Sequence, residues 1–194
     1  MRGFLISLSM LLFAPMALAD AGQIAAADRG PAVGSIIPSD LETIDQTGKS
    51  RHFEDLTGSK GLVLVFFRSA KWCGFCKDQL ANLATGSDEI TSRGYELVVL
   101  SYDKLKDIQK YNDEHQPGFP MLSDRKSKVI DAFGIRNEKY GKMHFANGVP
   151  HPMIFVIAPD KTIQAKLAEE GYKDRPSITV ITETIDALQA SAAP

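Results

Sequence analysis

The sequence predicts an α/β fold in which a central mixed β-sheet is flanked by helices and preceded by an N-terminal β-hairpin. Near-continuous apolar runs at residues 61–69, 95–103 and 153–159 are typical of strands that are buried on both faces of a sheet. Amphipathic segments lie between these runs, and helices that alternate with buried strands cover both faces of such a sheet. Because no internal repeat or linker divides the chain, we expect one folded domain over residues 36–190.

The first elements of this domain follow from turn residues and hydrophobic spacing. Residues 41–53 carry a polar, glycine-containing turn between apolar positions, which predicts the hairpin. After the first buried strand, residues 76–94 predict an amphipathic helix, and a break of this helix at Gly86 stays open as an alternative. After the second buried strand, the spacing of the apolar residues predicts a helix over residues 104–115.

The remaining elements complete the sheet and one helical layer. A helix is expected to begin at an N-cap formed by Ser123 or Asp124 and to end at Gly134. The third buried strand is followed by a short turn and a fourth strand around residues 162–168, so these two strands should pair antiparallel. A C-terminal helix over residues 175–190 closes the domain.

Residues 1–19, MRGFLISLSMLLFAPMALA, have the organisation of a secretory signal peptide. A positive charge at Arg2 precedes a short apolar run, and Ala17 and Ala19 form a small-x-small cleavage site. The apolar run is shorter than the ~20 residues that cross a membrane, although an uncleaved anchor remains the alternative. We therefore expect an exported, soluble periplasmic protein with no stable membrane insertion after cleavage, and a flexible lead-in over residues 20–35.

The chain contains only two cysteines, Cys73 and Cys76, and its formal net charge is −2. No run of basic residues stands out, so nucleic acid is not expected as a partner. A disulfide persists in an oxidising compartment, but a bridge that closes so short a loop stabilises a fold only weakly. Because exposed, short-loop bridges are the labile ones, the pair is predicted to be redox-active rather than structural.

Cys73 follows a strand and precedes a helix, which places its sulfur at a helix N-terminus. The helix dipole and the free N–H groups there stabilise a thiolate, so the pKa of Cys73 should lie below its usual value. Lys71 and Lys77 would add to this effect if their side chains point inward. Cys73 is then the attacking nucleophile, and the more enclosed Cys76 is the resolving thiol.

The stretch WCGFC after an apolar strand resembles the W-C-x-x-C active site of the thioredoxin superfamily. The segments FPMLSDRKSKVIDAFGI and HPMIFVIAPDKTI look like its redoxin branch, the AhpC/TSA-like proteins, and the resemblance covers residues 36–188. It implies a thioredoxin-like domain in which Trp72 lies beside the cysteines and Pro152 forms a cis peptide bond facing them. The backbone at His151 would then pair with an extended segment of a partner protein.

The sequence differs from both peroxiredoxins and thioredoxins at several of their active-site positions. Peroxiredoxins carry P-x-x-x-T/S-x-x-C, where this chain has Phe66 and Ala70 in place of the proline and the hydroxyl residue. The active-site arginine of that branch aligns with Pro152. Thioredoxins carry a buried acid where this chain has Phe67. These replacements therefore disfavour efficient peroxidase chemistry, although they do not exclude slow oxidation of the Cys73 thiolate.

We accordingly expect a thiol–disulfide oxidoreductase that uses Cys73 and Cys76 to exchange disulfides with protein thiols and disulfides in the periplasm. Its electron donor or acceptor is not identifiable from the sequence, and no cofactor or resident metal is expected. Two alternatives stay open: a thiol peroxidase of peroxiredoxin type, and a copper-binding chaperone on the same fold with His151 as third ligand. Residues 136–148 are expected to form a long loop near the active site that shapes partner choice.

Overall fold

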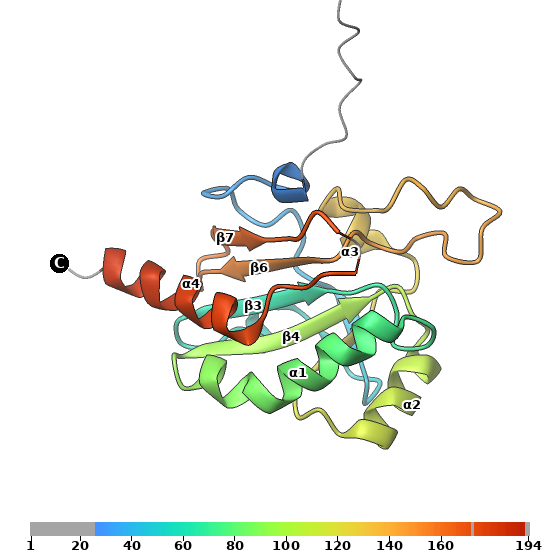
Figure 1. The fold of residues 1–194 in the computed structure, drawn as a ribbon, viewed down its shortest axis with the longest axis horizontal. Helices are drawn as coiled ribbons and strands as arrows, with labels where there is room; N and C mark the ends of the chain where they lie inside the picture. Colours follow the sequence, from blue (N-terminus) through green and yellow to red (C-terminus); the bar gives the residue numbers. More distant parts are fainter. Residues whose placement is uncertain (1–25, 172, 193–194) are drawn as a thin grey trace, which may run out of the picture.

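The computed structural model describes residues 26–171 and 173–192, which form a layered α/β domain (Figure 1). The predicted signal peptide lies outside these residues. The strands are β1 (Thr43–Asp45), β2 (Ser50–Arg51), β3 (Gly61–Phe66), β4 (Tyr95–Ser101), β5 (Met121–Ser123), β6 (Met153–Ile157) and β7 (Ile163–Leu167). The α-helices are α1 (Gly74–Thr91), α2 (Leu105–His115), α3 (Lys128–Ala132) and α4 (Ile178–Ser191), and 3-10 turns span Ala26–Asp28 and Phe53–Asp55.

The strands form one mixed sheet in the order β2-β1-β5-β4-β3-β6-β7. At its centre β3 pairs in parallel with β4 and antiparallel with β6, and β6 pairs antiparallel with β7. The predicted mixed sheet, its N-terminal hairpin and the antiparallel final pair are thus confirmed. Since β3 is central and buried along its whole length, the loop at its C-terminal end starts from a rigid support.

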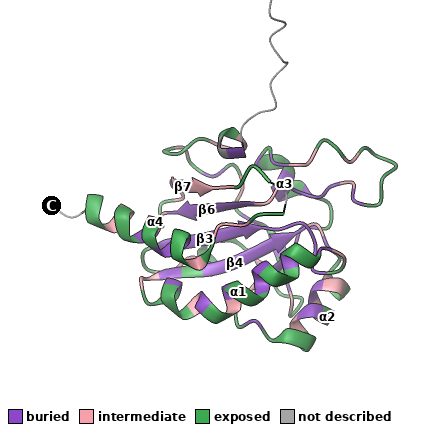
Figure 2. Cartoon of the chain, in the orientation of Figure 1, coloured by how far each residue is buried: buried purple, intermediate pink, exposed green. Residues whose placement is uncertain are grey.

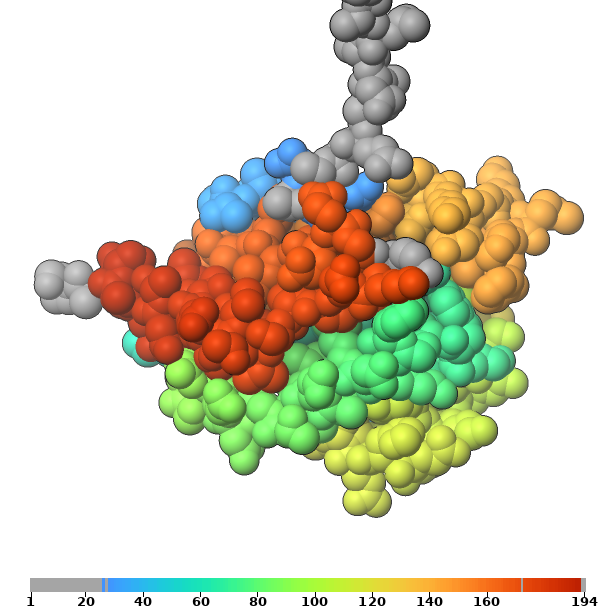
Figure 3. Space-filling view, in the orientation of Figure 1, coloured from blue at the N-terminus to red at the C-terminus, as the bar shows by residue number. Residues whose placement is uncertain are grey.

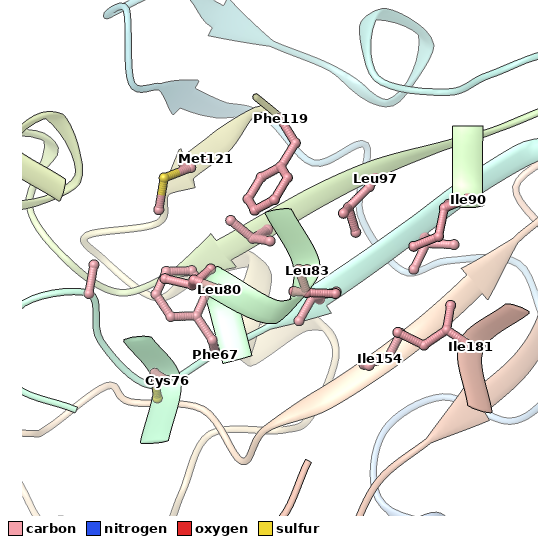
Figure 4. Packing of buried hydrophobic residues seen from close by; sticks show 14 of the residues in the cluster. Phe67, Cys76, Leu80, Leu83, Ile90, Leu97, Phe119, Met121, Ile154 and Ile181 are labelled. Carbon is pink, nitrogen blue, oxygen red and sulfur yellow. The ribbon is translucent and has the colours of Figure 1, made fainter. Parts of the chain in front are cut away.

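Successive side chains of β3 point to opposite faces of the sheet and enter two separate cores. Val63 and Val65 pack with residues of α1, α2 and α4 on one face. Leu62 and Leu64 pack with α3 and the N-terminal segment on the other face. Buried residues concentrate in the sheet and on the inner sides of the helices (Figure 2). The close-up in Figure 4 shows that Cys76 belongs to the first core, at the end nearest Phe67 and Leu80.

Helix α1 is continuous through Gly86, so the alternative of a break at this residue is wrong. The glycine allows α4 to approach, because a Cβ atom at position 86 would lie 2.6 Å from Cγ1 of Ile178. The close packing of α4 against α1 therefore explains why a glycine stands at position 86, although helix propensity alone disfavours it there.

Two short elements between β4 and β6 differ from the sequence-based expectation. Ser123 ends β5, a strand that the sequence did not predict, and α3 begins only at Lys128. The carboxylate of Asp124 nevertheless accepts hydrogen bonds from the N–H groups of Lys128 at 2.8 Å and Ile130 at 2.9 Å, in the first turn of this helix. The N-cap residue is Ser127, so the predicted N-cap at Ser123 or Asp124 is wrong. The chain first makes a turn, in which the N–H of Ser127 donates to the carbonyl of Asp124, and the helix begins after it.

The described part of the segment expected to be a flexible lead-in lies along β7. Gly34 N–H donates to the carbonyl of Ile163, and Ile163 N–H donates to the carbonyl of Ser35, both at 2.8 Å. Residues 34–37 therefore continue the sheet edge over a short distance. None of the helices in the part of the chain that the structure describes has the length and apolar character needed to span a bilayer.

Candidate active site

Cys73 is the N-cap residue of α1, as the strand–turn–helix pattern predicted. The loop that follows β3 brings it there with an extended backbone, and the carbonyl of Cys73 accepts the N–H of Lys77 at 3.1 Å. The first turn of α1 thus directs its dipole and its N–H groups toward the sulfur of Cys73. This placement favours a thiolate at Cys73 in the reduced protein.

Cys73 and Cys76 are joined by a disulfide, with their Cα atoms 5.2 Å apart. Cys73 is 4% exposed and Cys76 is 0% exposed, so an incoming molecule reaches Cys73 first. The expectation that Cys76 is the more enclosed residue agrees with this burial. The roles of attacking and resolving thiol remain predictions.

Lys71 and Lys77 do not supply the positive charge near the disulfide, because both side chains are exposed. Lys71 Nζ lies 3.6 Å from the carboxylate of Asp107 on α2, and its side chain is 62% exposed. The condition that its side chain points inward is thus not met for Lys71, which lies at the surface beside Asp107. An exposed ammonium that is paired with a carboxylate has little influence on a buried sulfur.

Arg175 supplies a cation that the sequence did not reveal. Its Nη2 atom lies 3.8 Å from Sγ of Cys76, and its Nε donates to Oε1 of Gln79 at 3.2 Å. Burial, and then the nearby charge of Arg68, lower the pKa of Arg175 to about 10. The residue lies 99 positions from Cys76 in the chain, and no local motif marked it.

Asp103 holds the loop between β3 and Cys73 in place. This buried carboxylate accepts hydrogen bonds from the hydroxyl of Ser69 at 2.7 Å and from the N–H of Ala70 at 2.6 Å. The hydroxyl of Ser69 in turn accepts the N–H groups of Lys71 and Trp72 at 3.0 and 3.3 Å. Burial raises the pKa of Asp103 despite these bonds. The network fixes the backbone immediately before Cys73.

Trp72 lies beside the cysteines in a cluster of aromatic side chains. Its indole N–H donates to the hydroxyl of Tyr102 at 3.0 Å, and its ring meets the ring of Phe145 edge to face at 5.5 Å. The guanidinium of Arg68 lies 4.9 Å from the centroid of the Trp72 ring and donates to the hydroxyl of Tyr140 at 2.7 Å.

The 136–148 segment is therefore a long loop next to the active site, as expected. Tyr140 and Phe145 belong to this loop, and both reach the residues that precede Cys73. In the space-filling view the gold loop borders the green N-terminal end of α1 (Figure 3). Its proposed influence on partner choice stays a prediction.

The predicted cis bond at Pro152 is wrong, because no peptide bond within the described ranges is cis. The preceding segment is held extended: Pro150 pairs with Arg136, and His151 N–H donates to the carbonyl of Ile135 at 2.7 Å. The His151 N–H thus has a partner inside the domain, which leaves strand pairing with another protein at this group without support. A substrate-binding role for His151 and Pro152 remains an untested prediction.

The imidazole of His151 points to a carboxylate rather than to a metal site. Its Nε2 lies 2.8 Å from Oε2 of Glu138, and this hydrogen bond lowers the pKa of Glu138. Across residues 26–171 and 173–192, no group of three or more His, Cys, Asp or Glu side chains is arranged to hold a metal ion. The copper-chaperone alternative gains no support from this geometry.

Comparison with known proteins shows that this chain is similar to peroxiredoxins. An AhpC/TSA family profile matches residues 33–166. Peroxiredoxin bcp1 of Schizosaccharomyces pombe is 29% identical over 130 residues, which cover 67% of this chain and 66% of that protein. Peroxiredoxin Bcp of Escherichia coli is 28% identical over 131 residues, covering 68% of this chain and 81% of that protein.

A solved structure supports the same relationship at the level of the fold. A mutant of peroxiredoxin 6 from Arenicola marina superposes with a TM-score of 0.73 at 19% identity, covering 84% of this chain and 76% of that chain. The predicted thioredoxin-like fold of the redoxin branch is thereby confirmed.

Proposed function

The chain belongs to the AhpC/TSA family, and from this premise we propose that it is a thiol peroxidase in which Cys73 reduces a hydroperoxide and Cys76 completes the cycle. The observation that carries the proposal is the Cys73–Cys76 disulfide at the N-terminus of α1, within the segment that matches the family. A redox enzyme is supported by the peroxiredoxin relatives. These relatives move the peroxidase alternative ahead of the disulfide oxidoreductase expected from the sequence.

The first step is the reduction of the hydroperoxide by the Cys73 thiolate. The sulfur attacks one oxygen of ROOH, the O–O bond breaks, and Cys73 becomes a sulfenic acid while RO⁻ leaves and takes up a proton as ROH. The N-terminus of α1 stabilises the thiolate that this step consumes. Because Cys73 is only 4% exposed, the peroxide must reach a sulfur that is largely enclosed at the helix end.

The second step closes the disulfide that the structure contains. The Cys76 thiolate attacks the sulfur of the Cys73 sulfenic acid, the S–S bond forms, and hydroxide leaves as water after gaining a proton. In the disulfide form the two Cα atoms are 5.2 Å apart, within the usual range for disulfides, and α1 is intact from Gly74, so the product of this step does not require α1 to unwind. A thiol reductant then returns two electrons and two protons to the pair.

The replacements at Phe66 and Ala70 require that other groups polarise the peroxide. The hydroxyl nearest in sequence to Cys73 on its N-terminal side, that of Ser69, already donates to Asp103. The N–H groups at the start of α1, the Arg68 guanidinium over Trp72 and the Arg175 guanidinium beside Cys76 are polar donors of this region. We therefore propose a peroxidase that relies on helix N–H groups and arginines rather than on a threonine or serine hydroxyl.

Thiol–disulfide exchange with proteins is the second candidate function, and Ala70 is the observation that favours it. A methyl group at this position contributes no hydrogen bond to a peroxide, whereas disulfide exchange needs none there. Both activities use Cys73 as the accessible sulfur and Cys76 as the resolving thiol. They differ in the oxidant, which is a hydroperoxide in one case and a protein disulfide in the other.

The deciding experiment mixes the reduced protein with hydrogen peroxide and, separately, with an insulin disulfide. Trp72 fluorescence and thiol alkylation report the formation of the Cys73–Cys76 disulfide in each reaction. If hydrogen peroxide oxidises the reduced protein faster than it oxidises free cysteine, the peroxidase proposal is supported. The Cys73→Ser variant should be inactive, and Cys76→Ser should accumulate a sulfenic acid. Peroxide oxidation no faster than that of free cysteine, together with rapid insulin reduction, would overturn the proposal in favour of disulfide exchange.

We further propose that the protein works in the periplasm, where protein thiols and disulfides are its partners. The support is the signal-like sequence of residues 1–19. Fractionation of cells that express the full chain tests this location. A mature protein that begins near Asp20 in the periplasmic fraction is expected, and an unprocessed protein in the cytoplasm would contradict it.

A further inference from the structure

Arg175 reaches the inner sulfur of the disulfide from the segment that enters α4. It precedes the N-cap residue Ser177 by two positions, and its guanidinium extends to α1. One nitrogen, Nη2, lies 3.8 Å from Sγ of Cys76, and Nε donates to Gln79 one turn further along the helix. Gln79 is itself buried, so its amide fixes the orientation of the guanidinium. The contact is directed at Cys76.

This arrangement matters because the two cysteines differ in how a thiolate is stabilised. Cys73 has the N-terminus of α1, whereas Cys76 is fully buried in the first core, where burial alone disfavours a charged sulfur. A cation at hydrogen-bonding distance reverses that preference, because an opposite charge within ~4–6 Å favours the charged form.

We propose that Arg175 is a catalytic residue that stabilises the thiolate of Cys76 whenever the Cys73–Cys76 disulfide opens or closes. The proposal rests on the redox function proposed above, and applies to the peroxidase and the exchange reaction alike.

During reduction, a thiolate of the reductant attacks Sγ of Cys73, a new S–S bond forms, and the Cys73–Cys76 bond breaks with its electron pair on Cys76. A leaving thiol that is stabilised as a thiolate departs faster. In the oxidising direction, the same charge keeps Cys76 deprotonated for its attack on the Cys73 sulfenic acid.

The charges around Arg175 are consistent with this role. The positive charge of Arg68 lowers the pKa of Arg175, and the negative charge of Asp174 raises it. Burial contributes most to lowering the pKa of Arg175 to about 10. Opening the disulfide adds a negative charge at 3.8 Å from this guanidinium, which favours its charged form.

The test measures the thiolate of Cys76 directly. In a Cys73→Ser background Cys76 is the only thiol, and absorbance at a thiolate wavelength follows its ionisation against pH without access to the buried sulfur. Arg175→Gln removes the charge, Arg175→Lys keeps it, and Arg93→Gln removes an arginine that pairs with the exposed Asp186 away from the site. Circular dichroism verifies that each variant is folded.

We expect Arg175→Gln to reduce the Cys76 thiolate fraction at neutral pH about tenfold or more, Arg175→Lys to retain most of it, and Arg93→Gln to leave it unchanged. In the dithiol protein, Arg175→Gln should lower the equilibrium constant for reduction by glutathione about tenfold, which corresponds to about 30 mV. Gln79→Met, which removes the acceptor of Nε, should shift both quantities in the same direction by less and serves if Arg175→Gln does not fold.

An unchanged thiolate fraction in the folded Arg175→Gln protein, or in Gln79→Met if that variant must replace it, would overturn the proposal. Equal losses of the Cys76 thiolate fraction in Arg175→Gln and Arg175→Lys would also overturn the proposal, because a purely structural role of Arg175 predicts that result. Neither measurement uses a peroxide or a protein substrate. A failure of the peroxidase proposal would therefore appear in the kinetics of the unmodified protein and not in these titrations.

Discussion

The carboxylate of Asp103 accepts a hydrogen bond of 2.7 Å from the hydroxyl of Ser69, which ties the end of β4 to the loop that carries Cys73. Both residues are buried, and Asp103 also receives the N–H of Ala70 and the hydroxyl of Ser101. The position of Cys73 thus depends on a polar network inside the domain as well as on the helix that follows it.

Replacement of Asp103 by alanine should destabilise the protein and slow the reaction of Cys73. The change leaves the buried hydroxyl of Ser69 and the N–H of Ala70 without this acceptor, which costs ~1–3 kcal/mol per buried group. Urea unfolding measures the loss, and the rate of disulfide formation measures the effect on the site. Asp107→Asn is the control, because its partner Lys71 is exposed and such pairs contribute ~0–1 kcal/mol. Equal effects of the two substitutions would contradict this account.

Asp45 should make the stability of the protein depend on acid pH. Burial alone would raise the pKa of this carboxyl, but hydrogen bonds from Thr47, Arg51 and the N–H of Lys49 outweigh it, so the pKa lies below 3.8. A carboxyl with a lowered pKa in the folded state contributes stability above its unfolded pKa, and this contribution is lost as the pH falls through the folded value.

The Asp45→Asn variant should therefore be less stable than the unmodified protein at pH 7, by ~1–3 kcal/mol, with a difference that shrinks below pH ~4. Thermal unfolding between pH 2 and 7 measures the difference, and Asp113→Asn, at an exposed position of α2, provides the comparison. A difference that stays constant over this pH range would show that the charge of Asp45 is not its cause.

Gly86→Ala tests the close approach of α1 and α4. Alanine favours a helix by about 1 kcal/mol over glycine, but a Cβ at this position would lie 2.6 to 2.8 Å from three atoms of the Ile178 side chain. Since overpacking costs ~1–3 kcal/mol, a net destabilisation is expected. Gly74→Ala, in the same helix with open space around the added methyl group, should not be destabilising.

A double variant, Gly86→Ala with Ile178→Ala, separates packing from backbone effects. If the clash with Ile178 is the cause, the cost of Gly86→Ala should largely disappear in the Ile178→Ala background. Chemical unfolding of the four proteins gives this coupling. An additive result would place the cost in the backbone of α1.

The elements with long apolar runs could be predicted from the sequence, because burial on both faces leaves few alternatives to β3, β4 and β6. The three-residue strand β5 could not be predicted, because its place in the sheet is determined by pairing with β1 and β4 rather than by its own hydrophobic pattern. The break at Gly86 was a reasonable alternative locally, and only the approach of α4 decides against it.

The residues of the candidate site likewise divide into those that could be predicted from the sequence and those that only the folded structure reveals. The strand–turn–helix pattern of the local sequence placed Cys73 at the start of a helix. The resemblance to thioredoxins placed Trp72 beside the cysteines, and the 136–148 segment was expected to be a loop near them. Arg175 contacts Cys76 across 99 positions of the chain, so only the folded structure brings the two together. The trans bond before Pro152 differs from the expectation because a resemblance to thioredoxins supplied that expectation, whereas local pairing holds the preceding segment extended.

Tyr140→Phe tests whether the loop is anchored by its contact with Arg68. The hydroxyl of Tyr140 accepts a 2.7 Å hydrogen bond from the buried guanidinium of Arg68, while the Arg68 guanidinium also lies 5.6 Å from the Tyr140 ring centroid. Phenylalanine keeps the ring contact and removes the acceptor, so a loss of ~1–3 kcal/mol is expected. Hydrogen exchange should become faster across residues 136–148 and stay unchanged in α4.

Met143→Ala is the matched control in this loop, because Met143 is 101% exposed and its truncation removes little packing. The Trp72 fluorescence should change in Tyr140→Phe, since Arg68 lies over the indole ring and loses one of its acceptors. In Met143→Ala the same signal should be preserved. Exchange rates of the loop that remain at the unmodified level in Tyr140→Phe would mean that the aromatic contact between Trp72 and Phe145 is sufficient to hold it.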